Sequence, residues 1–471
     1  MVDKREFEED SGVEVLVVLG SPDKIDDKLG LPLSNKERSG GFLLQVLDFL
    51  TVKWAVTYAV KCHPGVSPDK TGKEVKNKPS ADQMRLCSEW LMEDVKKYKP
   101  SVIVCLGEMA MKVFMGGNCP KSLKAAGKGR LCREDMPSVS VLVSKSPGIL
   151  DSGNVSDKAY QDLVEEYRRV FSLANKIAVE GWSEVPIDWE LILDPKEALA
   201  KAKAITADEV FVDVETSQPY KGENQDARTI WHPDCKLICV STTWKTVDDK
   251  YKTMVVAREA MTLEIMIALL GNRTMWAHNL LYEAAAFWRY FGINVFELAT
   301  ECLDSLLYNY LPDQNVQVNA LKDLCVNAFS TSDWSQPIKI SIEELYTLWE
   351  EQASSIRKES SRREKVLAKI AAGKKPYIKN ENGDRVEEDP NTWEPLPASP
   401  KEYVDLRDLP LKKVAFYCAQ DTFWTARLVI EVLRKKERQP HEIAWDLNKK
   451  AVEALAKVTR LGMPVNDSRV K

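Results

Sequence analysis

A chain of 471 residues is long enough for about three domains, and a hydrophobic share of 44% is sufficient for ordinary globular cores. The net charge of −5, from 66 basic and 71 acidic residues, neither requires nor forbids a nucleic-acid partner, because a local basic groove can exist within an acidic total. No apolar run reaches the roughly 18 residues of a membrane span, and the acidic N-terminus is unlike a signal peptide. We therefore expect no membrane partner, a cytoplasmic setting and reduced thiols for the ten cysteines.

The first 180 residues alternate short apolar runs with helical patterns. Strands are predicted at 13–19, 54–60, 102–106 and 139–143, and helices at 81–98 and 157–177. Such alternation favours an α/β fold with a parallel sheet that is covered on both faces. Ligands of these sheets bind beyond the carboxyl ends of the strands, which directs attention to the loops at Gly20, Lys61, Gly107 and Ser146.

Those loops carry a series of short motifs in a fixed order. They are Gly20-Ser21-Pro22, Gly30-Leu31-Pro32, Ser39-Gly40-Gly41, Lys61-Cys62-His63-Pro64, Leu106-Gly107 and Ser146-Pro147-Gly148. This series resembles the uracil-DNA glycosylase superfamily, especially its family 4 and 5 branches, over about residues 13–175. The resemblance implies a three-layer, parallel-sheet glycosylase-like domain.

Several residues depart from the glycosylase pattern. The family's catalytic loop usually begins with His-Pro, whereas Lys145 and Ser146 precede Pro147 here. Tyr58 stands at about the place of the Asn that reads uracil in the family. Cys62 and Cys87 match two of four iron–sulfur ligands, which does not support a cluster. We therefore predict a non-catalytic domain that binds DNA or a partner, with the lysine-rich loop around His63 either contacting phosphates or lying solvated.

A candidate cation-binding site is predicted at the mostly apolar stretch Phe211–Thr216. If it forms a strand, Asp213 and Glu215 point to the same face, about 6.5–7 Å apart along the strand. Two carboxylates this close repel each other unless a cation lies between them, and oxygen ligands suit Mg²⁺ or Mn²⁺. The alternative is a strand with two solvated polar positions.

Two later motifs extend this centre. Asn279 precedes a predicted helix as a plausible N-cap and Glu283 follows in its first turn, while Tyr417 and Asp421 share one face of the helix predicted at 415–433. Together, Asp-x-Glu, Asn-x-x-x-Glu and Tyr-x-x-x-Asp resemble the 3′–5′ exonuclease superfamily, best the proofreading domain of family A DNA polymerases. Glu283 replaces the usual Asp, a change that is similar to phage-type members. The fold implied is ribonuclease-H-like, with a mixed sheet.

The exonuclease resemblance implies roles for named residues. Two divalent ions, Mg²⁺ or Mn²⁺, would be held by four carboxylates, those of Asp213, Glu215, Glu283 and Asp421. Tyr417 would orient the attacking water, and the substrate strand would contact Thr216, Asn279 and Tyr282. The alternatives are a solvated first-turn carboxylate for Glu283 and a surface hydrogen-bonded pair for Tyr417 and Asp421.

The expected organisation has four parts. They are a glycosylase-like domain at 1–180, a linker at 181–194, an exonuclease domain at 195–440 with a charged insertion at about 331–410, and the start of a polymerase domain at 441–471. The last part is expected because a predicted helix at 444–461 continues as Gly462-Met463-Pro464-Val465-Asn466, which resembles the entry to a family A polymerase domain that is cut off here. The insertion is either a solvated arm or a contact to DNA or another subunit.

The leading functional hypothesis is a proofreading 3′–5′ exonuclease that acts on single-stranded or frayed primer-template DNA in a phage-infected host, beside other replication proteins. One alternative is a uracil-DNA glycosylase or repair protein with a degenerate exonuclease fold, which the missing His and Asn argue against. Another is a non-enzymatic replication scaffold, which the intact carboxylate set argues against.

Overall fold

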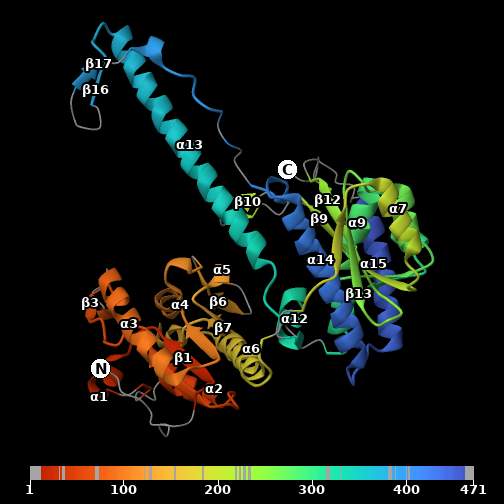
Figure 1. Ribbon diagram of the computed structural model, residues 1–471, viewed down its shortest axis with the longest axis horizontal. Coiled ribbons are helices and arrows are strands. Elements are labelled where there is room, and N and C mark those ends of the chain that lie inside the picture. Colours follow the sequence, from red (N-terminus) through yellow and green to blue (C-terminus); the bar gives the residue numbers. More distant parts are fainter. Residues whose placement is uncertain are drawn as a thin grey trace, which may run out of the picture. The chain divides into compact units, whose positions relative to one another are not determined.

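The structure is a computed structural model in which the chain divides into two compact units (Figure 1). It describes residues 12–461 except 31, 34–37, 69–73, 121, 127–129, 153–154, 183–184, 218–219, 222–223, 226–229, 232–234, 314–318, 330, 380–384, 388, 399 and 401–403. The first unit comprises residues 1–188, 304–336 and 423–449, and the second comprises 189–303, 337–422 and 450–471. Residues 462–466, on which the polymerase resemblance rests, lie outside the described residues.

The first unit is built on a five-stranded sheet in the order β2-β1-β5-β7-β6. Its strands are β1 (Val15–Leu19), β2 (Trp54–Tyr58), β5 (Val102–Leu106), β6 (Leu131–Arg133) and β7 (Met136–Ser144). The pairs β2–β1, β1–β5 and β5–β7 are parallel, and β6 pairs antiparallel with β7. Strands β1 and β5 are buried along their whole length, as their unbroken Val/Ile/Leu runs predict for a sheet covered on both faces.

Alternate residues of β1 pack into two separate cores. Val15 and Val17 face α2 (Arg38–Leu47) and α6 (Asp157–Glu180), whereas Leu16 and Val18 face α3 (Ala81–Tyr98) and α4 (Glu108–Met115). The predicted parallel sheet with helices on both faces is therefore confirmed. The remaining elements of this unit are α1 (Lys24–Leu29), β3 (Val66–Pro68), β4 (Glu74–Lys76), η1 (Gly116–Asn118), α5 (Leu123–Ala126), η2 (Pro147–Ser152), α11 (Ser305–Tyr310), α12 (Leu321–Phe329), η5 (Leu428–Val432) and η6 (Leu433–Lys435).

The second unit contains a six-stranded mixed sheet in the order β15-β14-β9-β12-β13-β8. Its strands are β8 (Trp189–Ile192), β9 (Glu209–Thr216), β12 (Leu237–Lys245), β13 (Tyr251–Ala257), β14 (Thr274–Ala277) and β15 (Glu301–Asp304). Strand β12 is antiparallel to both neighbours, while β14 runs parallel to β9 and β8 parallel to β13. The predicted fold class, α/β with a parallel-sheet domain and a ribonuclease-H-like mixed sheet, is confirmed. Strand β8 lies within the predicted linker at 181–194.

Helices cover this mixed sheet. They are α7 (Pro195–Ala204), α8 (Leu263–Leu270), α9 (Leu280–Phe291), α10 (Val295–Leu298) and α14 (Leu411–Arg427). Helix α15 (Glu442–Leu461) contacts α9 instead, because Arg460 lies over the ring of Trp288 at 4.1 Å. One core joins the sheet residues Ile238, Cys239 and Val255 to Val414 and Ala415 of α14. Helix α14 is therefore held on the sheet by apolar burial, which fixes the polar residues on the same helix face. Strands β10 (Tyr220–Lys221) and β11 (Asn224–Gln225) form a separate small ladder.

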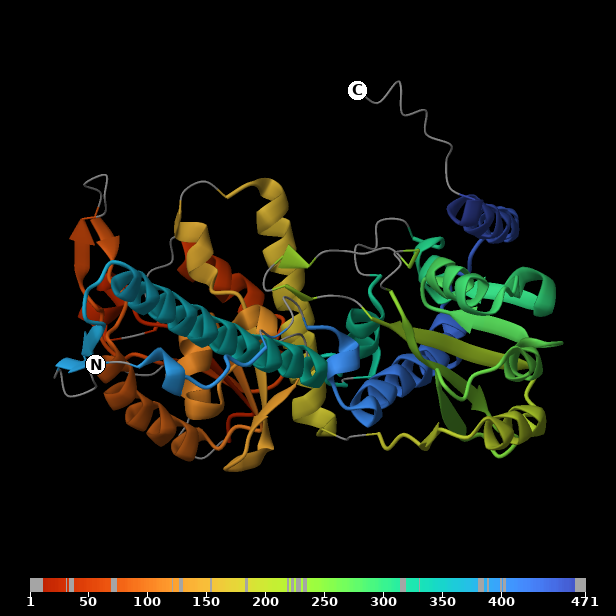
Figure 2. The same cartoon turned by 90° about the horizontal axis from the view of Figure 1, so that it is seen from above.

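The charged insertion contains a long helix, α13 (Gln336–Ala371), which is a continuous rod in both views (Figures 1 and 2). Its 36 residues correspond to a length of about 54 Å. It begins six residues before the predicted start at Ile342 and leads to a hairpin, β16 (Tyr377–Lys379) with β17 (Arg385–Glu387). Two short turns, η3 (Pro390–Thr392) and η4 (Leu406–Asp408), return the chain to α14. Among the described helices, none is both long and apolar enough to cross a membrane.

Candidate metal centre and cavity

Strand β9 presents Asp213 and Glu215 side by side, as its two-residue period predicts. Both residues are half-buried, and their neighbours Val212 and Val214 are buried. Asp213 pairs with Ser241 of β12, and Glu215 pairs with Cys239. A carboxylate oxygen of each residue and the Sγ of Cys418 lie within 4.8 Å of one another. Both carboxylates are therefore partly withdrawn from solvent.

Cys418 of α14 completes this group, and the sequence analysis missed it. Its thiol is fully buried and donates to Asp213 Oδ2 at 3.3 Å. Burial raises the pKa of Cys418 well above its ordinary value, helped by the contact with Cys239 and by the charges of Asp213 and Glu215. The thiol therefore stays protonated and orients Asp213 as a hydrogen-bond donor. Its position one turn before Asp421 was the available signal, because residues three apart share a helix face.

A buried hydroxyl group fixes α14 over this part of the sheet. Thr422 Oγ1 lies 2.7 Å from Ser241 Oγ and 2.8 Å from Thr243 Oγ1. Because Ser241 is the register partner of Asp213, these contacts bring the turn that carries Asp421 to the strand that carries Asp213. Asp421 is 5% exposed, which excludes the alternative of a surface Tyr–Asp pair, whereas Tyr417 is half-buried.

Helix α9 begins at the same edge of the sheet, because β14 runs parallel to β9 and leads directly into it. The hydroxyl groups of Tyr282 and Thr216 are hydrogen-bonded to each other, which joins the first turn of α9 to the end of β9. Glu283, the next residue, is only 3% exposed. The alternative of a solvated first-turn carboxylate is therefore wrong.

Asn279 takes the predicted N-cap position of α9 but does not act as predicted. Its backbone is left-handed, with φ of 75°, and its side chain caps no N–H of the described helix. The residue is exposed. A left-handed N-cap turns the side chain away from the first-turn amides that a capping side chain must reach, so the capping role is corrected, while a substrate contact stays a prediction.

The donor set fits hard divalent cations. Among the described residues, the group within 4.8 Å consists of Asp213, Glu215 and Cys418, and Glu283 and Asp421 stand outside it on α9 and α14. Four carboxylates, two of them buried, provide the oxygen ligands that Mg²⁺ and Mn²⁺ prefer. The protonated thiol of Cys418 adds a hydrogen bond and no charge.

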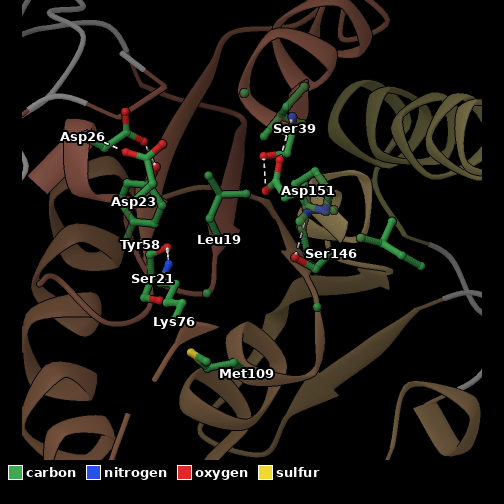
Figure 3. Close-up of a pocket in the computed structure, with 18 of the residues that line it drawn as sticks. Leu19, Ser21, Asp23, Asp26, Ser39, Tyr58, Lys76, Met109, Ser146 and Asp151 are labelled. Atoms are coloured by element: carbon green, nitrogen blue, oxygen red, sulfur yellow. Dashed lines mark hydrogen bonds between the residues drawn. The ribbon is translucent and has the colours of Figure 1, made fainter. Parts of the chain in front are cut away.

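The first unit holds a cavity of about 560 Å³ at the carboxyl ends of its parallel strands (Figure 3). The loops predicted from Gly20, Gly107 and Ser146 all line it. Gly107 has φ of +102°, and a Cβ there would meet the Cβ of Ser146 at 2.9 Å. This close approach of two loops needs glycine at position 107. In Figure 3, Tyr58 lies with Asp23 and Asp26 on one side, and Ser146 with Ser39 and Asp151 on the other.

Tyr58 is committed to the protein rather than to a ligand. Its hydroxyl donates to Asp26 Oδ2, which also accepts the backbone N–H of Leu33 at 3.2 Å. Tyr58 is 4% exposed and Asp26 is equally buried. Burial, followed by the hydrogen bond and charge of Asp26, raises the pKa of Tyr58 far above its ordinary value. The phenol therefore fills the wall of the cavity as a neutral donor.

Lys145 is directed away from this cavity. Its Nζ lies 2.9 Å from Glu166 Oε2, and it is not one of the lining residues. Glu166 also accepts from Ser144 Oγ at 2.6 Å and from the Lys145 backbone N–H at 3.1 Å. Burial acts to raise the pKa of Glu166, but these hydrogen bonds outweigh it and hold the pKa below its usual value.

The described part of the lysine-rich loop lines the cavity through Lys76, Asn77 and Lys78. Lys76 lines the cavity and donates to the carbonyls of Ser21 and Pro22 at 2.8 and 2.7 Å. Burial and the charge of Lys76 lower the pKa of His63, whose Nδ1 accepts the Gly65 N–H at 3.0 Å. Lys70 and Lys73 lie outside the described residues.

Comparison with known sequences supports the resemblance of the N-terminal domain to uracil-DNA glycosylases. Residues 7–165 match the Uracil DNA glycosylase superfamily. A Type-5 uracil-DNA glycosylase of Pyrobaculum aerophilum is 35% identical over 60 residues, which are 13% of this chain. The chain spans about a fifth, 22%, of that curated relative. The predicted glycosylase resemblance is thereby confirmed for the N-terminal domain.

Comparison with solved structures returns nucleases. An "apo form of the nuclease" aligns with 60% of this chain and 98% of its own, at 13% identity and a TM-score of 0.29. Brucella melitensis NrnC with bound Mg²⁺ aligns with 58% of this chain and 90% of its own, at 14% identity and a TM-score of 0.28. At these scores the likeness identifies neither an activity nor a ligand of this chain.

Proposed function

We propose that the second unit is a metal-dependent 3′–5′ exonuclease that removes nucleotides from single-stranded or frayed DNA ends. The proposal rests on one observation above all. Three motifs far apart in the sequence supply carboxylates on β9, α9 and α14, and β9 is hydrogen-bonded to each of the two helices, through Thr216 and Tyr282 and through Asp213 and Cys418. Two of these carboxylates, Glu283 and Asp421, are buried, and Asp213 and Glu215 are half-buried beside each other on β9. Carboxylates withdrawn from bulk solvent in this way would suit a divalent cation with oxygen ligands.

The chain's own residues then have separate tasks. Asp213, Glu215, Glu283 and Asp421 would hold two divalent ions, which when bound lower the pKa of a water and neutralise the leaving 3′ oxygen. The Cys418 thiol holds the Asp213 carboxylate in place, and the bond between Thr216 and Tyr282 holds the first turn of α9. Tyr417 orients the attacking water through its hydroxyl, and the exposed Asn279 contacts the substrate strand. The reaction cleaves the terminal phosphodiester bond and releases a nucleoside 5′-monophosphate.

We further propose that this nuclease proofreads for a family A DNA polymerase and that the glycosylase-like domain binds DNA or a partner. The support is the order of the three motifs and the polymerase-like residues after 461. A proofreading nuclease should degrade a primer with a mismatched 3′ end faster than a paired one, because the mismatched end frays into a single strand.

The test is degradation of a 5′-labelled single-stranded oligonucleotide in Mg²⁺ and in EDTA, beside matched and mismatched primer-templates. We expect a product ladder that shortens from the 3′ end in Mg²⁺ alone. Asp213→Ala should abolish it, whereas Asp248→Ala, which removes an exposed carboxylate from a turn of the same unit, should not. Equal degradation by Asp213→Ala and the parent protein would contradict the proposal.

A further inference from the structure

The middle of α13 carries two kinds of basic residue. Arg362 and Arg363 both contact Glu359, at 2.6 and 2.8 Å, and Arg363 also lies over the ring of Trp393 at 5.0 Å. Hydrogen bonds from the two guanidinium groups lower the pKa of Glu359 to about 2, so its charge persists at any ordinary pH. These two arginines are committed to the protein itself.

Arg357, Lys358 and Lys365 differ from that pair. All three are exposed, and within the described residues the structure shows no hydrogen bond or ion pair for their side chains. The sequence explains why, because every residue three or four positions away from them is Ser, Ala, Arg or Lys. A helix can pair charges only at those spacings. Within the described residues, these three side chains therefore have no ion-pair partner on α13.

These charges lie along one face. A shallow groove of about 460 Å³ is lined by Ser354, Arg357, Lys358, Ser361, Arg362 and Lys365, which we call the basic stripe. Ser354 lies one turn before Arg357, and Ser361 lies between Lys358 and Lys365, so both add a small hydroxyl group to this face. The eight-residue rise from Arg357 to Lys365 is about 12 Å, which is long enough to contact more than one phosphate of a DNA strand.

We propose that the basic stripe binds the phosphate backbone of single-stranded DNA. Lysine, arginine and serine are the side chains that contact phosphates, and such contacts need no apolar anchor. Protein partners are instead recognised mainly through buried aromatic anchors that act together with arginine, and no aromatic residue lines the stripe. That the DNA is single-stranded and is the strand degraded by the exonuclease rests on the proposed function, whereas the binding of a phosphate backbone does not.

The test measures binding without cleavage. Fluorescence anisotropy of a labelled oligothymidylate in EDTA compares the parent protein with the triple variant Arg357→Gln/Lys358→Gln/Lys365→Gln. Each phosphate contact contributes about 0.7 to the salt slope of single-strand binding, so the slope should fall by about 2 and the affinity by roughly 10- to 100-fold at low salt. The charge-preserving variant Arg357→Lys/Lys358→Arg/Lys365→Arg should bind like the parent.

A matched control removes three other exposed lysines of the same unit. It is Lys196→Gln/Lys252→Gln/Lys450→Gln. Unchanged affinity and slope in the stripe variant, or an equal loss in this control, would overturn the inference and leave the stripe as a solvated face or a site for an acidic protein. The outcome is independent of catalysis. If the parent protein shows no nuclease activity but the stripe variant binds more weakly, the inference holds and only the proposed function fails.

Discussion

Removing one charge from the candidate metal centre should have opposite effects on stability with and without Mg²⁺. Asp213 and Glu215 have carboxylate oxygens within 4.8 Å of each other. Coulomb's law gives a repulsion of about 1 kcal/mol at the dielectric constant of water and about 3.5 kcal/mol at an effective value of 20. Asp213→Asn removes this repulsion but weakens the hydrogen bond from Cys418. We therefore expect the free energy of unfolding in EDTA to rise by about 1–2 kcal/mol.

In saturating Mg²⁺ the parent protein should instead be more stable than the Asp213→Asn variant. Binding to the folded state alone stabilises the parent by about 2.7 kcal/mol when Mg²⁺ is at 100 times its dissociation constant. The variant loses a ligand and with it most of this gain. The expected result is a variant that is more stable than the parent in EDTA and less stable in Mg²⁺.

The assay is urea unfolding in both conditions, followed by tryptophan fluorescence. Because the chain has two units, the transition that responds to Mg²⁺ is compared, rather than a single global value. Asp248→Asn is the matched control, since Asp248 pairs with Lys250 in an exposed turn and should show no such reversal. A variant that is less stable than the parent in EDTA, or one that gains as much from Mg²⁺, would refute the reasoning.

Three further predictions concern single residues. Glu283→Gln should cut nuclease activity strongly while circular dichroism shows an intact fold, and Glu283→Asp should retain substantial activity. Equal activity in the parent protein and both variants would exclude a metal-ligand role for Glu283. Thr422→Val leaves the buried Ser241 hydroxyl without its Thr422 contact, so urea unfolding should show a loss of about 1–3 kcal/mol, and Thr422→Ser should lose less than about 1 kcal/mol. Because folding lowers the pKa of Glu166, this carboxylate stabilises the folded protein fully at pH values above its unfolded-state pKa of about 4.5. That stabilisation is lost as the pH falls through the pKa of the folded state. The stability difference between Glu166→Gln and the parent should therefore shrink below pH 4.5, and a difference that is constant from pH 7 to pH 3 would contradict this.

Periodicity predicted the parts of the fold that depend on local pattern. The buried runs of β1 and β5 are unbroken Val/Ile/Leu segments, which only a doubly covered sheet explains. In β9 the two-residue period placed Asp213 and Glu215 on one face before any tertiary information was used. The hairpin of β16 and β17 was not predicted, because each strand is only three residues long, too short to show a two-residue period.

The remainder of the candidate centre depends on tertiary contacts. Cys418 has no motif of its own, and its importance follows from the apolar packing that sets α14 on the sheet beside Asp213. The burial of Glu283 was equally hidden, since a first-turn carboxylate normally lies in solvent near the helix dipole. Asn279 shows the opposite error: its residue type predicted a cap, but the chain enters α9 in a left-handed turn.

The first domain should not excise uracil, although it keeps the cavity of its fold. Excision requires a flipped base, a group that reads its edge and a donor that stabilises the departing base. Tyr58 stands where the reading Asn is expected, and its hydroxyl is bound to the buried Asp26. Lys145 was the residue best able to replace the missing His, and it pairs with Glu166 outside the cavity lining. Ser146 alone remains at that loop, as a short neutral donor.

The test of this last prediction is a uracil-containing duplex treated with alkali to reveal abasic sites, in EDTA to silence the nuclease. We expect no cleavage at uracil by the parent protein and none by Lys145→Ala. Tyr58→Asn should not create the activity, because it replaces the reader without supplying the second donor. Cleavage specific to uracil that disappears in Lys145→Ala would show that Lys145 can leave Glu166 and serve the cavity, and the chain would then combine two activities.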